Sequence, residues 1–307
     1  MQDALKTKLT ARAELYRQIR DFFAAGNVLE VETPLLCSHT VTDVYTESIA
    51  AGTRFLQTSP EYCMKRLLCE GSGPIYQICK AFRKEESGSN HNPEFTMLEW
   101  YRPGYNHHQL MDELSNLIQQ LLHTSPPTRQ SYRDCFLQFT KLDPFNDKLN
   151  TLYNYITHHN LLQDLRDIDY DTALQVILSE HIEPNIGNQQ PHFIYDFPPS
   201  QAALAKIRHE RPPVAERFEL YYKGFELANG FHELTDAHEQ QQRFERDQQK
   251  RQAMGLVVPD IDYNFITALR QGLPNCAGVA VGLDRLLMLK TQSNSIKDVL
   301  TFSFSEC

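Results

Sequence analysis

A pair of β-rich stretches joined by a long polar segment constrains the fold of this chain more than any other feature of its sequence. Residues 75–83 and 95–102 have the composition of strands, and the segment 84–93 between them is rich in charged and polar residues. Two strands arranged in this way are typical of an antiparallel hairpin with a long tip. Hairpins in place of a repeated β-α-β order favour an α+β fold with a mainly antiparallel sheet.

Helical patterns surround this hairpin. Apolar residues spaced three and four apart predict helices over about 5–25 and 107–123. The middle of the chain is helical in pattern and carries little recognisable chemistry, which we interpret as a helical insertion over about 105–190. A polar helix is expected over about 235–254. Further strands are expected at 193–197, 218–222, 224–234 and 278–281.

The composition is that of an ordinary globular protein with an acidic balance. The chain has 307 residues, 41% of them hydrophobic, and 39 Asp and Glu against 30 Lys and Arg, which gives a net charge of −9. At about 150 residues per domain, this length fits two domains or one large one. An acidic chain lacks the general basic surface with which proteins neutralise nucleic-acid phosphates. The balance therefore argues against a general nucleic-acid binder.

The cysteines and the apolar runs indicate the compartment. Seven cysteines are present, an odd number, with no C-x-x-C pair. This usage indicates reduced thiols and argues against a disulfide framework or a cysteine-based zinc site. No run approaches the ~20 apolar residues of a membrane span, and the first residues of the chain form no apolar stretch of the kind that a secretory signal needs. We therefore expect a cytoplasmic protein without a membrane partner.

The second strand of the hairpin carries an acid where a buried side chain is expected. Successive side chains of a strand alternate between its faces, so Phe95, Met97, Glu99 and Tyr101 share one face. A buried carboxylate is costly unless it is paired. We therefore expect Glu99 to meet a cation, which either an internal salt bridge or a bound ligand could supply. At the end of the first strand, Arg83 could clamp a phosphate or form a surface ion pair.

Two later segments also carry candidate site residues. Glu226 and Glu233 are separated by seven positions with an Asn-Gly pair between them, and they can converge on a cation only if the chain bends at 229–230. A hairpin with exposed acids is the alternative. The small residues of 278–282 would let a flat ligand approach the backbone, or would serve close helix–sheet packing. Arg285 follows in the first turn of the next helix, where it could reach an anion.

Together these segments resemble the signature motifs of class II aminoacyl-tRNA synthetases, in the form that the lysyl enzymes use. Residues 82–85 (Phe-Arg-Lys-Glu) with 91–101 (from His-Asn-Pro-Glu-Phe to Glu-Trp-Tyr) are similar to motif 2, and 278–285 are similar to motif 3. The helix leading into 31–34 (Val-Glu-Thr-Pro) resembles motif 1, and 226–233 resembles the metal-binding stretch of the lysyl enzymes. The resemblance covers nearly the whole chain. No G-x-G-x-x-G or P-loop motif competes with it.

The resemblance implies a single catalytic domain over 1–307, with a six- to seven-stranded antiparallel sheet flanked by helices and a homodimer built through motif 1. It also implies ATP and Mg²⁺ as cofactors and the AMP-forming activation of a lysine-like amino acid. Arg83 would hold the α-phosphate, and Phe95 would stack under the adenine. Glu226 and Glu233 would hold the metal ion. No protein nucleophile is needed, because the substrate carboxylate attacks the α-phosphate itself.

The residues that the resemblance assigns to the site fall into three overlapping sets. The catalytic set consists of Arg83, Glu226, Glu233 and Arg285. The ATP-binding set consists of Arg83, Lys84, Glu85, Asn92, Phe95, Glu226, Leu227, Gly282 and Arg285. The amino-acid-binding set consists of Ser59, Pro60, Glu61, Glu99, Tyr101, Glu233 and Ala280. In this last set, Glu99 and Tyr101 would meet the amino groups of the substrate.

Two departures from the lysyl enzymes narrow the expected function. Motif 1 begins almost at the start of the chain, so we expect no anticodon-reading OB domain, and Ala280 stands where their motif 3 usually has glycine. The added methyl group would crowd the α-amino group of α-lysine. This combination resembles a truncated group of lysyl-type paralogues that attaches (R)-β-lysine to a lysine ε-amine of elongation factor P. We therefore expect that protein, and not free tRNA, as the acceptor.

Three alternatives compete with this interpretation. One is an enzyme without an anticodon domain that charges tRNA or another acceptor with α-lysine. Another is a non-catalytic paralogue, which would be expected to lose at least one of the charged residues Arg83, Glu85, Glu226, Glu233 and Arg285, all of which are present. The third is an ammonia-dependent asparagine synthetase on the same fold, which would need a pocket for aspartate. Glu99 and Tyr101 favour a cationic substrate instead.

Overall fold

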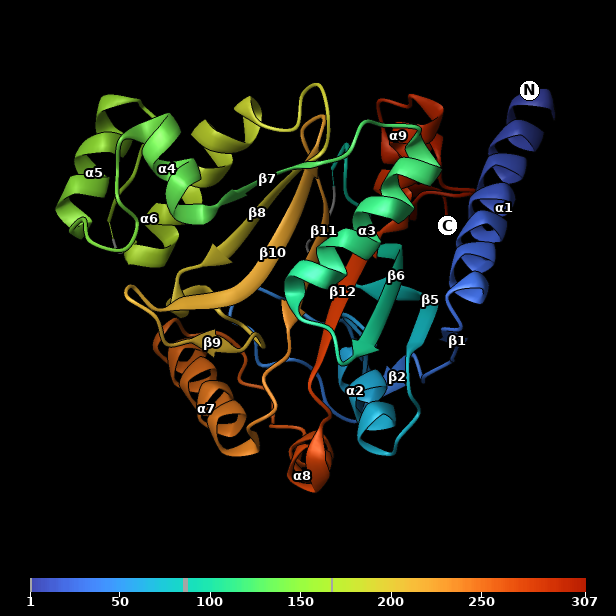
Figure 1. Ribbon diagram of the computed structural model, residues 1–307, viewed down its shortest axis with the longest axis horizontal. Helices are drawn as coiled ribbons and strands as arrows, with labels where there is room; N and C mark the ends of the chain where they lie inside the picture. The colour runs from blue at the N-terminus through green and yellow to red at the C-terminus, as the bar shows by residue number, and fades with distance from the viewer. Residues whose placement is uncertain (1, 85–87, 167) are drawn as a thin grey trace.

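The computed structural model describes residues 2–84, 88–166 and 168–307, and one large sheet runs through its centre (Figure 1). Among these residues, six antiparallel strands form the middle of the sheet in the order β5–β6–β12–β11–β10–β8. Their bounds are β5 Ile75–Phe82, β6 Glu94–Pro103, β8 His192–Phe197, β10 Val214–Tyr222, β11 Phe225–His232 and β12 Cys276–Gly282. The α+β fold with a mainly antiparallel sheet is confirmed.

Short strands extend the sheet at its edges, to nine strands within the described part of the chain. β1 (Leu29–Glu30) pairs in parallel with β5, and β7 (Thr128–Ser131) pairs in parallel with β8. β9 (Ile207–Arg208) pairs with β10. A separate small sheet consists of β2 (Leu36–Cys37), β4 (Arg54–Leu56) and β3 (Ala50–Ala51). The additional strands have two to four residues, which is too short for an alternating pattern to mark them in the sequence.

Strands β5 and β6 form the hairpin that the sequence predicted. Their antiparallel register runs without interruption from Ile75 opposite Tyr101 to Phe82 opposite Glu94. Leu98 of β6 is completely buried in the largest apolar cluster of the molecule. The residues beside it in the chain point the other way, and this is the face on which the candidate site lies.

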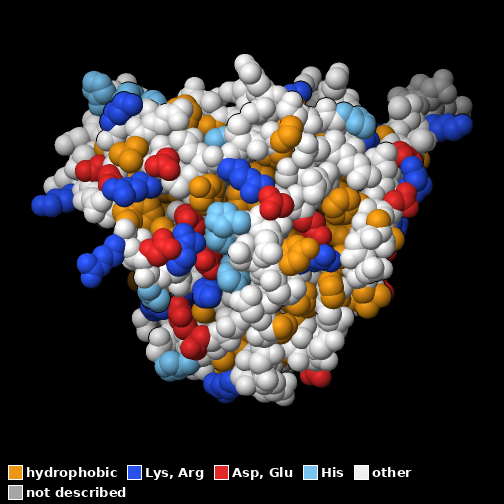
Figure 2. Space-filling view, in the orientation of Figure 1, with side chains coloured by type: hydrophobic (Ala, Val, Ile, Leu, Met, Phe, Trp, Pro, Cys, Tyr) orange, Lys and Arg blue, Asp and Glu red, His pale blue; other side chains and the backbone are white. Residues whose placement is uncertain are grey.

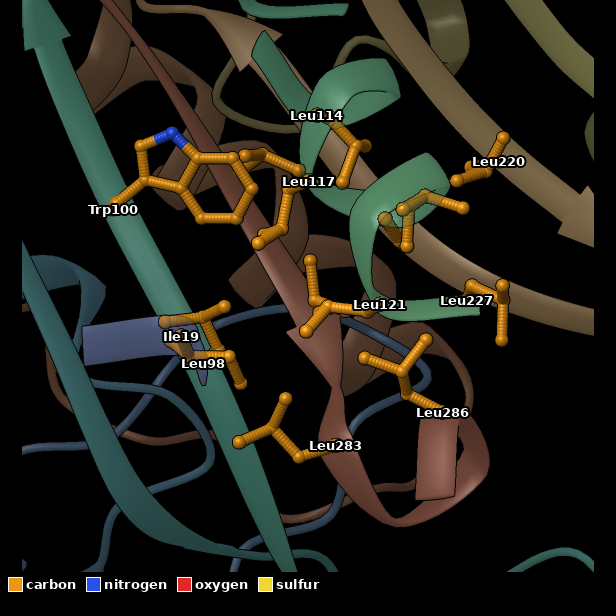
Figure 3. Close-up of a cluster of buried hydrophobic side chains, with 14 of the residues drawn as sticks. Ile19, Leu98, Trp100, Leu114, Leu117, Leu121, Leu220, Leu227, Leu283 and Leu286 are labelled. Carbon is orange, nitrogen blue, oxygen red and sulfur yellow. The ribbon is translucent and has the colours of Figure 1, made fainter. Parts of the chain in front are cut away.

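Three helices cover the first face of the sheet: α1 (Gln2–Ala25), α3 (His107–Leu122) and α9 (Leu283–Thr291). Leu98 and Trp100 of β6 point into this layer, and Figure 3 shows them among the leucines of α3 and α9. The residues that α1 buries there recur every four positions, as a helix with one apolar stripe requires: Leu15, Ile19 and Phe23.

A second group of helices packs at one end of the sheet. It contains α4 (Tyr132–Thr140), α5 (Leu149–His158), α6 (Tyr170–Ile177) and the short turns η1 (Leu178–Ile182) and η2 (Glu183–Asn185). These elements enclose an apolar cluster of their own against β8 and β10. Since α3 packs on the central sheet instead, the separate helical unit begins at α4 and not near residue 105.

A third apolar cluster lies where β6 ends and β5 and β12 begin. It is built by α2 (Glu61–Cys69), α7 (Ala237–Ala253) and α8 (Tyr263–Gly272), of which α7 is the polar helix expected from the sequence. The remaining short turns are η3 Pro199–Gln201, η4 Ile296–Asp298 and η5 Phe304–Glu306. Acidic and basic side chains intermingle over the face seen in Figure 2. In the described residues, no helix combines the length and the apolar character that crossing a membrane requires.

Candidate active site

Most of the predicted site residues of the sheet lie on the face that turns away from α1, α3 and α9. In an antiparallel sheet, residues that pair directly point to the same face. Glu99 of β6 pairs with Ala280 of β12, and Ala280 pairs with Asn229 of β11, which pairs in turn with Glu219 of β10. The next row across the same strands is Tyr101, Gly278, Phe231 and Arg217. The predicted alternation of β6 therefore holds, and it places Glu99 and Tyr101 in neighbouring rows.

Gly278 makes room for two of these side chains. A Cβ atom at position 278 would lie 2.2 Å from the ring of Tyr101 and 2.6 Å from Oε1 of Glu233. Neither distance is possible between real atoms, so only glycine lets Tyr101 and Glu233 approach each other across β12. From the sequence alone, the small residues of 278–282 can be interpreted as room either for a flat ligand or for close packing of a helix on the sheet. At this position the reason is instead the meeting of two site side chains.

A bulge in β11 turns Glu226 onto the site face. The pairing shifts between Leu220 and Tyr221 of β10, which leaves Leu227 of β11 as the extra residue. One extra residue reverses the alternation of a strand. Glu226 therefore points to the same face as Asn229, whereas an uninterrupted strand would turn it toward the apolar core.

The bend expected at Asn229–Gly230 does not exist, because both residues pair continuously with β10 and β12. At about 3.3 Å per residue, the seven steps from Glu226 to Glu233 would span about 23 Å in a straight strand. The prediction that these two acids converge on one metal ion is therefore wrong. Gly230 is needed for packing and not for a turn, since a Cβ there would lie 2.4 Å from the ring of Phe218.

A pocket at the junction of β6, β11 and α9 gathers most of the predicted ATP-binding set. Its lining includes Arg83, Asn92, Phe95, Glu226, Leu227, Ala280, Gly282 and Arg285. The guanidinium carbon of Arg83 lies 5.2 Å from the centre of the Phe95 ring. Nη1 of Arg285 donates a hydrogen bond to the carbonyl of Glu226 at 2.7 Å. We call this cavity the nucleotide pocket.

Two members of the ATP-binding set are not part of this lining. Nζ of Lys84 lies 3.0 Å from a carboxylate oxygen of Glu47, with which it forms an ion pair. Glu85 lies outside the described residues. Lys84 directly follows Arg83, which lines the nucleotide pocket.

Three acids lie close together beside the nucleotide pocket. Burial raises the pKa of Glu226 to about 7, and the charge of Glu219 raises it further against the opposing effect of Arg285. Burial likewise raises the pKa of Glu183 to about 7, with Glu219 and Glu226 adding to the shift. Arg217 forms an ion pair with Glu219. The sequence analysis missed Glu219, although an acid inside the apolar strand 218–222 was a usable signal.

A second cavity lies along the loop before α2, and Ser59 and Glu61 are part of its lining, with Arg54, Arg66 and Asp262 further along it. Pro60 is the residue that precedes the first turn of α2. Oγ of Ser59 donates to Oε2 of Glu99 at 2.8 Å, and the hydroxyl of Tyr101 donates to Oε1 at 2.7 Å. We give the name amino-acid pocket to the contacting group that begins at this cavity, which consists of Ser59, Glu61, Lys65, Glu99, Tyr101 and Glu233. Ser59 and Tyr101 therefore fix the carboxylate of Glu99 from both sides.

Glu99 does not have the internal cation that its burial led us to expect. The residue is 2% exposed, and burial raises its pKa to about 7, with the nearby charge of Glu61 adding to the effect. None of the lysine, arginine and histidine side chains in the described ranges forms an ion pair with it. The sequence left two partners open for Glu99, an internal salt bridge and a bound ligand. Since no internal salt bridge is found among the described residues, a cationic ligand remains.

Lys65 is the site residue that the sequence analysis missed entirely. It lies on α2 and is 1% exposed. Its Nζ is 2.7 Å from Oε1 of Glu61 and 2.5 Å from Oε2 of Glu233. These two carboxylates raise the pKa of Lys65 in spite of its burial, so the lysine remains charged. Its spacing of four residues from Glu61 within a helix was the available signal.

The charges around the amino-acid pocket do not balance. Among the described side chains, Lys65 is the one cation that forms ion pairs within this group, against three acids, Glu61, Glu99 and Glu233. With all four ionised, the group carries an excess of two negative charges. A buried group of this kind can stay ionised only when a ligand supplies positive charge.

Comparison with known proteins agrees with this geometry. The model of the family described as tRNA synthetases class II (D, K and N) matches residues 1–306. The chain belongs to this family. It is 51% identical to the elongation factor P–(R)-β-lysine ligase of Photorhabdus laumondii, over 97% of this chain and 95% of that protein. It is 50% identical to the ligase of the same name from Salmonella typhi, over 96% of this chain and 94% of that protein.

The class II synthetase motifs can now be placed in the structure. The motif 2 stretch forms the end of β5, the tip of the hairpin and β6, and the motif 3 stretch forms β12 and the start of α9. Both border the nucleotide pocket. The motif 1 stretch lies at the far edge of the sheet, where α1 leads into β1. The four stretches recognised in the sequence thus occupy distinct places in one class II architecture.

Proposed function

We propose that this chain is an ATP-dependent, AMP-forming ligase that activates (R)-β-lysine and transfers it to a lysine ε-amine of elongation factor P. The observation that carries the proposal is that Glu61, Glu99 and Glu233 share Lys65 as their cation, so that ionisation of all three acids leaves two negative charges for a ligand to balance. (R)-β-Lysine carries two ammonium groups, which match that excess. The relatives that are half identical over almost the whole chain share a name that pairs elongation factor P with (R)-β-lysine as the partners of a ligase.

The amino-acid pocket offers an acid for each ammonium group. We assign one ammonium group to Glu99, whose carboxylate is already oriented by Ser59 and Tyr101. The other belongs beside Glu61 and Glu233, which Lys65 holds in place. Pro60 fixes the start of α2 behind them. Ala280 pairs directly with Glu99 across the sheet, so its methyl group restricts the position that an α-amino group would take.

The nucleotide pocket supplies the groups that ATP requires. Arg83 and Arg285 would contact the phosphates, since a guanidinium group binds a phosphate with two parallel hydrogen bonds. Phe95, with Asn92, Leu227 and Gly282, would enclose the adenosine, and Lys84 and Glu85 would also contact the nucleotide.

Magnesium fits the acids beside the nucleotide pocket. The charge of Glu219 raises the pKa of Glu226, and a divalent cation held between the two carboxylates would relieve this repulsion. These two residues would therefore hold Mg²⁺, in place of the pair Glu226 and Glu233. The ion supplies charge neutralisation on the triphosphate. Glu233 remains in the amino-acid pocket with Lys65.

The reaction then needs two displacements and no nucleophile from the protein. In the first, a carboxylate oxygen of the amino acid bonds to the α-phosphorus, and the bond to pyrophosphate breaks. Arg83 and Arg285 stabilise the charge on the transferring group. In the second, the ε-amine of the acceptor lysine bonds to the carbonyl carbon and loses a proton, and AMP leaves. The role of Glu99 and Glu233 is to hold the substrate so that its carboxylate faces the nucleotide pocket.

We also propose that two copies of the chain associate through motif 1. Several large apolar side chains are exposed on α1 and on the segment that follows it: Leu5, Leu9, Leu29, Leu35 and Leu36. Exposed apolar side chains gathered in one region are typical of an interface between subunits. An acceptor that is a translation factor implies that the protein acts in the cytoplasm.

Incubation of the protein with ATP, Mg²⁺ and labelled (R)-β-lysine tests the proposed transfer. Elongation factor P and total tRNA are supplied in separate reactions. We expect label on elongation factor P and none on tRNA, and no label when the target lysine of elongation factor P is replaced by arginine. Label on tRNA alone would contradict the proposal and favour the enzyme that charges tRNA.

A further inference from the structure

A buried polar cluster lies on the opposite face of the sheet from both pockets. Among the residues that the structure describes, His107, Glu216 and His232 form a group whose ligand atoms all lie within 4.8 Å of one another. His107 begins α3, Glu216 belongs to β10, and His232 ends β11. Their side chains are 1%, 8% and 6% exposed. None of the three lines the nucleotide pocket or the amino-acid pocket.

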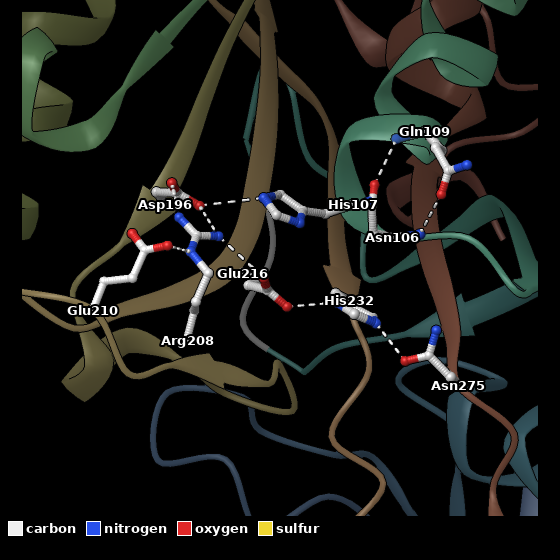
Figure 4. A network of polar contacts seen from close by, with 9 residues as sticks. All are labelled: Asn106, His107, Gln109, Asp196, Arg208, Glu210, Glu216, His232 and Asn275. Atoms are coloured by element: carbon white, nitrogen blue, oxygen red, sulfur yellow. Dashed lines mark hydrogen bonds and ion pairs between the residues drawn. The ribbon is translucent and has the colours of Figure 1, made fainter.

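The hydrogen bonds around the cluster determine which ring nitrogens carry protons (Figure 4). Nε2 of His107 lies 3.2 Å from a carboxylate oxygen of Asp196, which can only accept, so this nitrogen is the donor. Nε2 of His232 lies 2.8 Å from Oδ1 of Asn275, which also accepts. In a neutral imidazole the second nitrogen then carries a lone pair. The Nδ1 atoms of His107 and His232 therefore both present lone pairs to the cluster.

The two Nδ1 lone pairs lie close to a carboxylate oxygen of Glu216, so three hydrogen-bond acceptors face one another with no donor between them. Nδ1 of His232 faces Oε2 of Glu216 at 2.5 Å, and Nδ1 of His107 is buried with no hydrogen-bond partner in the described structure. A proton on Nδ1 of His232 would satisfy Glu216 but would leave Nδ1 of His107 without a partner. A metal ion would satisfy all three atoms, because it accepts electron pairs from two imidazoles and a carboxylate at once.

The surroundings of the cluster are those of a metal site. Ligand histidines typically donate their other N–H group to a carboxylate or carbonyl oxygen, as His107 does to Asp196 and His232 does to Asn275. Arg208 donates to Oε1 of Glu216 at 3.0 Å and to Asp196 at 2.6 Å, which leaves Oε2 of Glu216 directed at the histidines. The position of His107 is fixed by the first turn of α3.

That turn is held by a capping box. The side chain of Asn106 accepts from the backbone N–H of Gln109, and the side chain of Gln109 accepts from the backbone N–H of Asn106.

The network around the cluster also has an excess of negative charge. Asp196, Glu210 and Glu216 pair with the single guanidinium group of Arg208. Glu210 is exposed to solvent, so the two largely buried carboxylates leave one negative charge unbalanced, which a bound cation would neutralise.

We propose that His107, Glu216 and His232 bind one divalent transition-metal ion of the zinc type, with water as the fourth ligand. Two imidazole nitrogens and one carboxylate oxygen are a donor set that zinc prefers. The ion replaces the hydrogen bond between Glu216 and His232 and ties the start of α3 to β10 and β11. His232 directly precedes Glu233, so the ion also anchors the end of β11 that carries an acid of the amino-acid pocket.

Metal analysis of the purified protein, with no substrate present, tests this site. The protein is stripped with a chelator, incubated with Zn²⁺ alone, and dialysed. We expect one zinc per chain in the wild type and none in His107→Leu. Replacement with Co²⁺ should give the visible absorption of tetrahedral cobalt in the wild type only. The matched control is His108→Leu, which changes an exposed histidine beside the cluster and should retain one zinc.

A second measurement covers the case in which His107→Leu does not fold. The melting temperature of the wild type should rise when Zn²⁺ is added to the stripped protein and fall again with chelator. The absence of bound zinc and of any such shift would overturn the proposal. Zinc that binds equally to the wild type and to His107→Leu would also overturn it, because the ion would then occupy another part of the surface.

Discussion

The two pockets meet the same face of the sheet, the amino-acid pocket through Glu99 and the nucleotide pocket through Ala280 and Glu226, yet their charges are arranged in opposite ways. The nucleotide pocket places Arg83 and Arg285 beside the acids, which suits a ligand that is itself an anion and arrives with a cation. In the amino-acid pocket the acids outnumber Lys65, which suits a ligand with two positive charges. One face of the sheet therefore carries two differently charged regions: arginines beside acids in the nucleotide pocket, and an excess of acids in the amino-acid pocket. We therefore expect the substrate to span the two pockets, with its carboxylate directed toward the phosphates.

Removing an acid from the nucleotide pocket should have the largest effect on activity. Glu226→Gln keeps the size of the side chain but removes a proposed metal ligand, and we expect ATP–pyrophosphate exchange to fall about 100- to 1,000-fold. Glu245→Gln on the exposed side of α7 is the control and should leave exchange unchanged. If Glu226→Gln retained exchange within about twofold of the wild type, Glu226 would not be a metal ligand that the reaction needs.

Loss of Lys65 should affect stability more than any other single change in the amino-acid pocket. Lys65→Met leaves Glu61 and Glu233 buried without their cation, which we expect to cost about 3–5 kcal/mol in the free energy of unfolding. Urea denaturation measures it, with Lys297→Met on the surface as the control. The double variant Lys65→Met/Glu233→Gln should recover much of the loss. Equal stability of the single variant and the wild type would show that Lys65 does not balance these acids.

The amino-acid pocket should also bind its substrate in a pH-dependent way. Because the pKa of Glu99 is raised to about 7 in the free protein, a proton must leave before an ammonium group can pair with it. We expect the KM for the amino acid to rise about tenfold for each pH unit below 7 and to level off above it. The stability of the free protein depends on pH in the opposite direction to the affinity for the substrate. The stabilisation from protonated Glu99 is complete below its ordinary pKa and is lost as the pH rises through 7.

Tyr101→Phe sharpens this prediction. The Tyr101 hydroxyl donates to Glu99 and lowers the pKa of that carboxyl group, so its removal should move the midpoint of the KM profile to higher pH. Glu99→Gln should raise KM and abolish the dependence altogether. A KM profile without an inflection near pH 7 in the wild type would contradict the assignment of Glu99.

The smallest expected effect concerns the methyl group of Ala280, which lines the nucleotide pocket and pairs with Glu99 across the sheet. Ala280→Gly should shift the preference between (R)-β-lysine and α-lysine by about tenfold toward α-lysine, since one methyl group in a pocket is worth about that much. The ratio of kcat/KM values in ATP–pyrophosphate exchange measures the shift. An unchanged ratio would show that this methyl group does not contact the substrate.

Much of the sheet and part of the site could be predicted from the sequence. The alternation of β6 correctly placed Glu99 and Tyr101 on one face, because that periodicity is a local property of a strand. The bend at Asn229–Gly230 was predicted wrongly. A local Asn-Gly signal was overridden by pairing with strands on both sides, and Gly230 serves the packing of Phe218.

What the sequence could not show are the contacts between distant segments. Lys65 pairs with Glu233 although α2 and β11 are far apart in the chain, and neither segment alone indicates the other. Glu219 and Glu226 come together through a bulge at Leu227 that no sequence periodicity marks. In both cases the missing information was the register of the sheet, which depends on the whole fold.

The acids of the amino-acid pocket should require two ammonium groups on the substrate. ATP–pyrophosphate exchange with matched analogues measures how much each ammonium group contributes to kcat/KM. The analogues are (R)-β-lysine, 6-aminohexanoic acid and (R)-3-aminohexanoic acid, which differ only in which ammonium group is present. We expect kcat/KM to be at least about 100-fold lower for each analogue with a single ammonium group, since each leaves a buried acid unpaired. Comparable values for (R)-β-lysine and either analogue would contradict the account.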